Sequence, residues 1–321
     1  MQLNIKDIVP EPKVATDWRL SKISNKLRPK SLSDLLKDIP EFQRELLPNS
    51  RQAITQINRA LRKNQFIAPS EETKKGNLYS SVALAIDRGA LMLRDEIDNN
   101  RLITTLKIHN KYGNKKYKDH RNAIVIIINK FESIAQNEPF SKETAGYLFL
   151  LGKLEPIIRG FRPFSDVIEH GLPSNLSTDS IRNWLSDIIS ADLSSEIIDL
   201  LNVISKLQLK GHFFANPIFG GIGPISGSDG DWITGETLVE LKCTVRGVKR
   251  EYVAQIICYS ALNKIGPKAA TIPPINKLAL CLPRQSSIVV GSVDEWLSAF
   301  GAPPSEFIYK SIEEYFSSYK A

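Results

Sequence analysis

The sequence predicts an α/β fold with a mainly helical N-terminal region. Residues 232–239 have the pattern of two short strands joined by a two-residue turn, a helical pattern follows over 251–264, and an apolar run at 278–282 is typical of a buried strand. The first half of the chain instead shows apolar residues at helical spacing. This order divides the chain into a mainly helical region at 1–185 and an α/β domain at 186–321.

The N-terminal region has few features besides its helical spacing. Pro40, Pro48 and Pro69 mark breaks between helices. The apolar run at 123–128 is too short to span a bilayer, so we interpret it as a core segment. We expect this region to shape substrate access or to bind a partner protein. Helical spacing is found in four segments: 31–37, 51–63, 79–98 and 148–158.

The elements around the hairpin follow from the same patterns. Ser194 or Ser195 can cap a helix that ends near 210–211. The stretch 216–230 is rich in Gly and Pro, so we predict a loop or an irregular strand there. Downstream, the sequence predicts a polar connection at 244–249, a helix at 251–264 that stops at Gly266-Pro267, strands at 278–282 and 287–290, and a helix at 294–300.

The register of the hairpin follows from its turn. The two-residue loop is the Gly-Glu dipeptide at 235–236, and Gly at the first loop position is what a type II′ turn requires. Thr234 then lies opposite Thr237. Counting outward from that pair places Asp231 opposite Glu240.

The predicted register gathers charged side chains on one face of the hairpin. Directly opposed residues share a face, so the carboxylates of Asp231 and Glu240 point the same way. Lys242 shares that face by the same count, and Asp229 falls opposite Lys242 if the pairing continues that far. The other face carries apolar residues for the core: Trp232, Val239 and Leu241.

The opposed carboxylates predict a metal site. They repel each other unless a cation lies between them, and hard oxygen ligands suit Mg²⁺ or Mn²⁺. We expect Asp231, Glu240 and the backbone carbonyl of Leu241 to hold the ion, with Asp229 as a further candidate. Such an ion would activate a water, and Lys242 would orient or help to deprotonate it and neutralise charge in the transition state. The pattern therefore predicts phosphodiester hydrolysis, and the alternative is an exposed hairpin with scattered charges.

Two residues on the next helix extend this pattern. Gln255 and Tyr259 are four residues apart and share a helix face. Together with Asp231 and the run Glu240-Leu241-Lys242, they resemble the PD-(D/E)XK nuclease superfamily and, within it, the RecB-like branch. The resemblance covers roughly residues 195–295. It implies a restriction-endonuclease-like core, in which helices flank a central mixed sheet.

The resemblance also implies roles for these residues. Asp231, Glu240 and Lys242 would be the catalytic set. Gln255 and Tyr259 would be supporting residues that help to place the DNA and the site.

The chain departs from that family in some respects. Its three cysteines are scattered, whereas the iron–sulfur members of the branch use clustered cysteines, so we expect no such cluster. His212 is the nearest candidate for the branch's first-motif histidine, although a lone histidine is more often an ordinary loop or surface residue. Glu155 and Glu196 are open alternatives for an upstream carboxylate. Asp229 and Asp231 both lie on the predicted face, and we prefer Asp231 because it faces the strand glutamate.

The composition is typical of a globular protein in a reducing compartment. Hydrophobic residues make up 42% and charged residues 24% of the chain. Three cysteines without paired spacing argue against a disulfide framework. No apolar run approaches membrane-spanning length, and the N-terminus lacks the apolar segment of a signal peptide. We therefore expect a cytoplasmic protein without membrane contact.

A basic segment predicts contact with nucleic acid. The formal net charge of +7 favours a polyanionic partner, and residues 101–121 contain seven basic residues and one acidic residue. Tyr112 and Tyr117 lie between them and are placed to stack on bases. The alternative for such a run is a solvated loop. The expected phosphate contacts are Lys111, Lys115, Lys116, Lys118 and Arg121.

Two classes of function follow. The first is a nuclease that depends on Mg²⁺ or Mn²⁺ and cuts DNA, with RNA as the alternative substrate; the superfamily's uses suggest antiviral defence or DNA repair in prokaryotes. The second is a catalytically inactive protein of the same fold that binds nucleic acid or a protein partner. The complete set of Asp231, Glu240 and Lys242 favours the enzyme, because an inactive protein has no need to keep all three in register.

Overall fold

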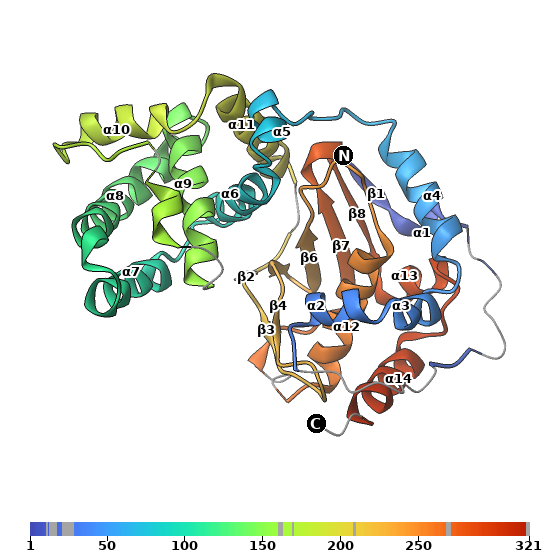
Figure 1. The fold of residues 1–321 in the computed structure, drawn as a ribbon. Coiled ribbons are helices and arrows are strands. Elements are labelled where there is room, and N and C mark those ends of the chain that lie inside the picture. Colours follow the sequence, from blue (N-terminus) through green and yellow to red (C-terminus); the bar gives the residue numbers. More distant parts are fainter. Residues whose placement is uncertain are drawn as a thin grey trace. The chain divides into compact units, whose positions relative to one another are not determined.

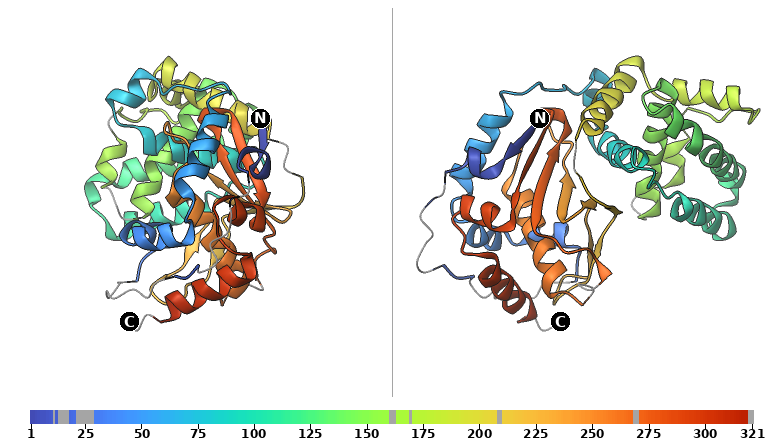
Figure 2. Two further views of the ribbon diagram at one scale, coloured as in Figure 1. Left: turned by 90° about the vertical axis from the view of Figure 1, so that its right-hand side faces the viewer. Right: turned by 180° about the vertical axis from the view of Figure 1, so that it is seen from behind.

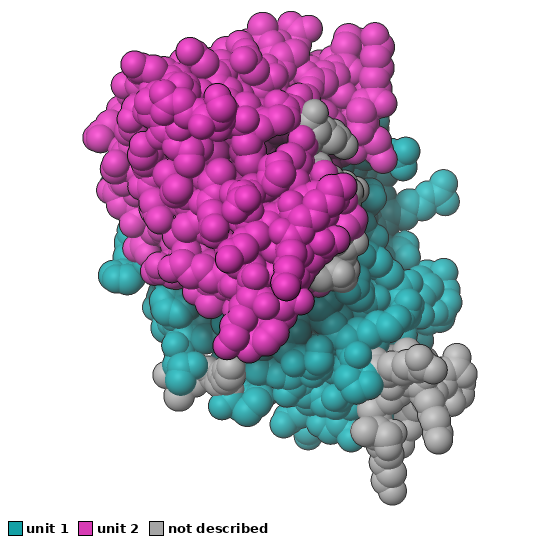
Figure 3. Space-filling model, turned by 60° about the vertical axis from the view of Figure 1, so that its left-hand side comes forward, with its two compact units in different colours: residues 1–66, 207–321 teal, residues 67–206 magenta. Residues whose placement is uncertain are grey.

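The structure is a computed structural model of the 321-residue chain. It describes all residues except 11, 13–17, 21–28, 160–162, 169, 208–209, 268–270 and 319–321. The described residues form two compact units, coloured separately in Figure 3: unit 1 comprises 1–66 and 207–321, and unit 2 comprises 67–206. These boundaries differ from the predicted division at 185/186, because the first 66 residues belong with the C-terminal part of the chain.

Unit 1 is an α/β structure with a six-stranded mixed sheet, as the sequence predicts for the C-terminal part (Figure 1). Its two parallel pairs are β1 with β8 and β6 with β7, and the remaining neighbours are antiparallel. The N-terminal edge strand and the other edge strand were not predicted. In sheet order the strands are β1 (Gln2–Asn4), β8 (Ser287–Ser292), β7 (Lys277–Leu282), β6 (Thr237–Leu241), β5 (Trp232–Thr234) and β2 (Phe213–Ala215).

The main core lies on one face of this sheet. Leu238 of β6 and Leu280 of β7 belong to it, together with the buried residues of helix α12 (Arg250–Ile265). Because side chains alternate along a strand, Glu240 shares the face of Leu238 and is directed to the α12 side. Full burial of one leucine contributes roughly 1.5–3 kcal/mol, so the leucines fix which face of β6 turns toward α12.

Helix α12 is the central helix of unit 1. Eleven consecutive residues from Val253 to Asn263 are buried, so the helix is enclosed on all sides. Gly266 has an extended backbone (φ −73°, ψ 159°) because the residue before Pro267 is restricted to extended conformations, and the helix ends there. The strand β6, helix α12 and strand β7 follow one another in the predicted order.

Other helices complete the covering of unit 1 (Figures 1 and 2). Helices α2, α3 and α14 pack against α12, while α1 and α13 lie against β8. Ser31 caps α2 by accepting a hydrogen bond from the Asp34 N–H. The helices are α1 (Ile5–Ile8), α2 (Leu32–Asp38), α3 (Pro40–Leu46), α4 (Ser50–Leu61), α13 (Val293–Ala299) and α14 (Ser305–Ser317).

Unit 2 is helical, in agreement with the prediction of a helical N-terminal region. Its central helix α9 packs against α6, α8, α10 and α11. The approach of α6 to α9 requires Gly152, because a Cβ there would lie 2.5 Å from the Ser81 carbonyl oxygen. The helices are α5 (Glu71–Lys75), α6 (Tyr79–Met92), α7 (Asn100–Tyr112), α8 (Lys118–Asn137), α9 (Lys142–Ile158), α10 (Thr178–Asp187) and α11 (Ala191–Ser205), with short 3₁₀ turns at Lys115–Tyr117 and Phe164–Val167.

Several predicted boundaries are wrong. Helix α11 begins earlier than predicted, because Ser190 and not Ser194 or Ser195 caps it, and it ends at Ser205. Helix α6 ends at Met92 and not near residue 98 as predicted. Shortly after Met92 the chain turns through Asp95, which has a φ of 56°. In the described part of the chain, every helix falls short of the length and apolar character that crossing a membrane takes.

Candidate metal site beside helix α12

The β5–β6 hairpin has the predicted register. Thr234 pairs with Thr237, and the pairing continues to Trp232 opposite Val239. Gly235 has a φ of 57°, whereas Glu236 is not among the residues with positive φ, as expected when only the first loop position is left-handed. Trp232, Val239 and Leu241 are buried, as predicted.

Asp231 lies immediately before β5 and is tied to β6 through its side chain. Its Oδ2 accepts a hydrogen bond of 2.5 Å from the Leu241 N–H, and its carbonyl accepts one from the Asn216 N–H. A strand residue directs its N–H and C=O to the same side, so the Leu241 carbonyl turns toward the Asp231 side of β6. The structure therefore brings together Asp231, Glu240 and the Leu241 backbone.

The pairing of the hairpin does not continue as far as Asp229, so the condition for placing Asp229 opposite Lys242 is not met. It belongs to the two-residue strand β4 (Ser228–Asp229), which pairs with β3 (Ile218–Phe219) in a separate small sheet. Lys242 instead donates its backbone N–H to the Cys281 carbonyl of β7. The pairing changes at Gly230, whose N–H bonds to the Pro217 carbonyl, and the Asp229 side chain is exposed.

Glu240 is the most deeply buried acid of the site. Its side chain is 4% exposed, and its Oε1 accepts a hydrogen bond of 2.6 Å from Lys242 Nζ. Its Oε2 is buried and has no hydrogen-bond partner among the described residues. Leaving a buried charged oxygen unpaired costs free energy, so Glu240 is a strained position for a carboxylate without a further cation.

Lys242 lies beside both carboxylates on the α12 side. Burial is the largest single influence and lowers its pKa, but the negative charges of Glu240 and Asp231 outweigh it, so the pKa of Lys242 is raised above its ordinary value. The ammonium also lies 5.2 Å from the centre of the Tyr252 ring. The lysine is thus a protonated group held between acids and an aromatic ring.

Gln255 and Tyr259 connect α12 to the segment that carries the acids. Gln255 Nε2 donates to the Tyr259 hydroxyl (2.8 Å), which donates to the Asp229 carbonyl (2.9 Å). The Tyr259 ring stacks on Phe219 with centroids 4.9 Å apart. Burial, followed by the charge of Glu240, raises the pKa of Tyr259, so its hydroxyl stays a donor.

Two site neighbours were missed by the sequence reasoning. Tyr252 precedes Gln255 by three residues on α12, so its helical spacing was a usable signal. Phe219 lies in the stretch that was predicted as loop or irregular strand, and no local pattern marks its contact with Tyr259.

The oxygen donors of the site suit the predicted metal. Among the described residues, no group of three His, Cys, Asp or Glu side chains is placed to hold an ion, so Asp229, Asp231 and Glu240 do not form a three-carboxylate centre. Two carboxylates and the Leu241 carbonyl remain as oxygen donors. Mg²⁺ usually keeps several waters and uses one or two carboxylates, so this set and the unpaired Glu240 oxygen fit it.

The candidates for the first-motif histidine and the upstream carboxylate do not lie at the candidate metal site. His212 is exposed, and its carbonyl accepts the Gly235 N–H, which places it at the turn end of β5 and away from Asp231. Glu196 accepts hydrogen bonds from the Ser70 N–H and the Thr73 hydroxyl. Glu155 forms ion pairs with two arginines, Arg88 and Arg159. Both glutamates thus stabilise contacts within unit 2.

The predicted phosphate-binding residues of 101–121 divide into two kinds. Lys111, Lys115, Lys116 and Lys118 are exposed around the end of α7 and the start of α8. Arg121 is 2% exposed, and its guanidinium donates to Asn110 Oδ1 and the Asn114 carbonyl. Its burial removes it from the predicted set of phosphate contacts, because it holds the α7–α8 connection together.

Comparison with known proteins adds no assignment. No family model, no curated protein and no solved structure matches the chain significantly. The fold and site define the chain as an α/β protein that carries paired carboxylates and a lysine beside a buried helix.

Proposed function

We propose that this chain is a metal-dependent nuclease of the PD-(D/E)XK type that hydrolyses phosphodiester bonds of DNA. The observation that carries the proposal is the environment of Glu240, which has one oxygen on Lys242 and the other buried without a partner among the described residues. An unpaired buried polar group costs about 1–3 kcal/mol, and more when charged. A bound cation would remove that cost.

The metal proposed for this site is Mg²⁺ or Mn²⁺. Asp231, Glu240 and the Leu241 carbonyl would hold it, because they are hard oxygen donors on adjacent positions of the hairpin. When bound, such an ion polarises a phosphoryl oxygen and lowers the pKa of a coordinated water.

The protein residues supply position and charge. Lys242 places a cation next to the carboxylates, where it would neutralise charge that develops on a phosphate. The hydrogen bonds from Gln255 to Tyr259 and from Tyr259 to the Asp229 carbonyl hold the segment that leads to Asp231. A group held in this way loses less freedom when the substrate binds.

The arrangement of the unit supports the same proposal. The hairpin, α12 and β7 follow in the order of the superfamily's α/β core, and the charges of Glu240, Asp231 and Asp229 act on Tyr259, whose hydroxyl accepts a hydrogen bond from Gln255. We therefore propose a restriction-endonuclease-like core for unit 1. The proposed setting is antiviral defence or DNA repair.

The test is a cleavage assay on linear duplex, circular duplex, single-stranded DNA and RNA with Mg²⁺ or Mn²⁺. We expect the wild type to cut DNA only with metal, and Lys242→Ala to lose at least about 100-fold in rate because a charge that stabilises the transition state is removed. The matched control is Lys277→Ala, an exposed lysine at the start of β7 that should leave the rate unchanged.

Two results would contradict the proposal. One is a wild type that cuts no substrate with either metal, which would favour a non-catalytic binding protein. The other is a Lys242→Ala variant that cuts as fast as the Lys277→Ala control.

A further inference from the structure

Two segments of unit 1 are basic and contain no acidic residue. Residues 46–66 include α4 and carry four basic side chains, and residues 241–250 follow the candidate site and carry four more. Acids occur only just outside them, at Glu45, Glu240 and Glu251. The eight basic residues are Arg51, Arg59, Arg62, Lys63, Lys242, Arg246, Lys249 and Arg250.

The fold places these two segments against each other. Asn58 of α4 donates from Nδ2 to the Val248 carbonyl (3.0 Å) and accepts the Val248 N–H at Oδ1 (2.8 Å). Arg250 Nε donates to the hydroxyl of Ser50 at the start of α4 (2.7 Å). Segments almost 200 residues apart in sequence thus form one surface that gathers positive charges, in which Lys249 lies 3.4 Å from the Glu251 carboxylate.

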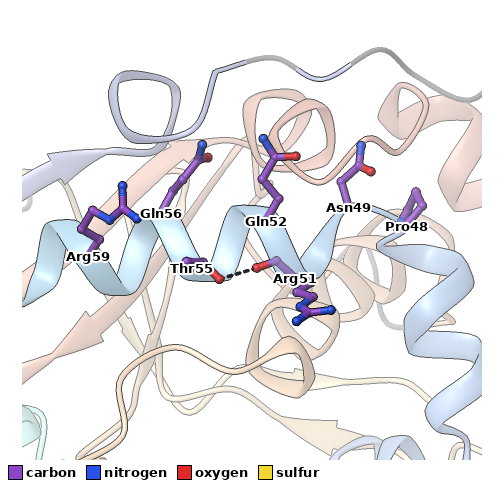
Figure 4. Close-up of a pocket in the computed structure, with 7 residues that line it drawn as sticks. All are labelled: Pro48, Asn49, Arg51, Gln52, Thr55, Gln56 and Arg59. Atoms are coloured by element: carbon purple, nitrogen blue, oxygen red, sulfur yellow. Dashed lines mark hydrogen bonds between the residues drawn. The ribbon is translucent and has the colours of Figure 1, made fainter.

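The outward face of α4 carries a shallow pocket of about 500 Å³ (Figure 4). Its charged lining residues are Arg51 and Arg59, and amides and a hydroxyl supply the other polar groups. Gln56 Oε1 is buried and has no hydrogen-bond partner among the described residues. Figure 4 shows Arg51 directed to one side of the helix and Gln52, Gln56 and Arg59 to the other.

The basic surface is continuous with the candidate site. The ammonium groups of Lys242 and Lys249 lie 5.2 Å and 5.5 Å from the centre of the same Tyr252 ring. Burial, and then the positive charge of Arg44, lowers the pKa of Arg250. Such a concentration of like charge suits a polyanion better than a single anion.

We propose that α4 and residues 241–250 form the surface that binds the phosphodiester backbone of the nucleic acid on its way to Asp231, Glu240 and Lys242. The α4 basic surface comprises Arg51, Arg59, Arg62, Lys63, Arg246, Lys249 and Arg250. The inference rests on the proposed function, because it assigns the substrate contacts of that site. It differs from the sequence prediction, which placed these contacts at 101–121 in unit 2.

The test compares two triple variants of the full chain that lose equal charge. Arg51→Gln/Arg59→Gln/Arg246→Gln removes exposed arginines of the α4 basic surface, and Lys115→Gln/Lys116→Gln/Lys118→Gln removes exposed lysines of unit 2. Binding is measured by fluorescence anisotropy with three labelled probes, a DNA duplex of about 30 base pairs, single-stranded DNA and RNA. Divalent metal is left out so that no probe is cut. The measurement is repeated from about 50 to 200 mM salt.

We expect the arginine variant to bind nucleic acid on the order of 100-fold more weakly than the wild type near 0.1 M salt. The slope of log association constant against log salt concentration should become less steep by about 3, because each lost phosphate contact contributes about 0.9 to that slope. The lysine variant should keep the wild-type affinity and slope. The nucleic acid that binds more tightly, DNA or RNA, is the one whose phosphodiester backbone this surface recognises.

An arginine variant with wild-type affinity and slope would overturn the inference, as would a wild type that binds no nucleic acid at low salt. These failures are distinguishable from failure of the proposed function. A protein that binds through the arginines but never cuts contradicts hydrolysis and supports the surface, whereas one that cuts normally without the arginines contradicts the surface alone.

Discussion

At the scale of single residues, Glu240 links stability to function. Folding places its carboxylate on the same strand face as Leu238, where apolar packing against α12 excludes water. Lys242 satisfies only one of its two oxygens. A chain selected for stability alone gains little from an acid there, because an apolar residue of similar volume avoids the desolvation cost. A carboxylate that serves as a metal ligand carries this desolvation cost whenever its ion is not bound.

Metal binding should therefore stabilise the protein through Glu240. At a metal concentration ten times the dissociation constant, we expect the wild-type free energy of unfolding to rise by about 1.4 kcal/mol, since the ion binds the folded state only. Glu240→Gln should lose this gain, and Glu236→Gln on the turn should keep it. Thermal or urea unfolding with and without Mn²⁺ measures the effect, and equal gains in both variants would show that Glu240 does not bind the metal.

At the scale of elements, local patterns predicted the hairpin well. The two-residue turn with Gly at 235 and the count outward from Thr234 opposite Thr237 were sufficient for the register of the two strands. They failed at Asp229, because its backbone pairs with Ile218, in a stretch where two-residue strands leave no periodicity to detect. Strands β1 and β2 were also missed. Three-residue edge strands depend on distant partners, and no local pattern specifies those.

Helix α13 offers a test of local stabilisation. Glu295 Oε2 accepts the Ser292 N–H (2.8 Å), and Lys6 lies 3.3 Å from its other oxygen. The hydrogen bond from the Ser292 backbone, aided by Lys6, lowers the pKa of Glu295 below its ordinary 4.5. A carboxyl with a lowered pKa in the folded state contributes stability above its unfolded-state pKa, and that contribution is lost as the pH falls through the folded-state value.

We therefore expect Glu295→Gln to lower the free energy of unfolding by about 0.5 kcal/mol at pH 7, with the difference from wild type disappearing as the pH falls through the lowered folded-state pKa of Glu295. Urea unfolding at several pH values measures this. Glu313→Gln, an exposed position in the middle of α14, is the control and should change little. A Glu295→Gln deficit that persists unchanged at low pH would contradict the linkage.

At the scale of the whole molecule, the chain builds unit 1 from two separate pieces. Residues 1–66 supply β1, α1, α2, α3 and α4, and residues 207–321 supply the rest. Contacts such as the hydrogen bond from the Leu32 N–H to the Ser228 hydroxyl join the two pieces. A division at 185/186 followed from composition and periodicity alone, and neither reveals that a helical unit is inserted between the halves of an α/β unit.

The same long-range folding brings α4 to the candidate site. In the sequence, residues 46–66 carry four basic residues, whereas the segment 101–121 carries seven and is therefore the more obvious candidate for binding nucleic acid. The contacts of Asn58 with Val248 and of Ser50 with Arg250 show that α4 borders the segment after Lys242. The residues of the site were therefore predictable from a short motif, while their surroundings were not.

The most direct test of the account is the rate of DNA cleavage with Mn²⁺ by Glu240→Gln compared with Glu236→Gln. Both substitutions remove one carboxylate from the same hairpin, one beside Lys242 and one at the turn. We predict a loss of at least about 100-fold for Glu240→Gln and a wild-type rate for Glu236→Gln. Equal rates for the two variants, with both folded, would contradict the assignment of the site.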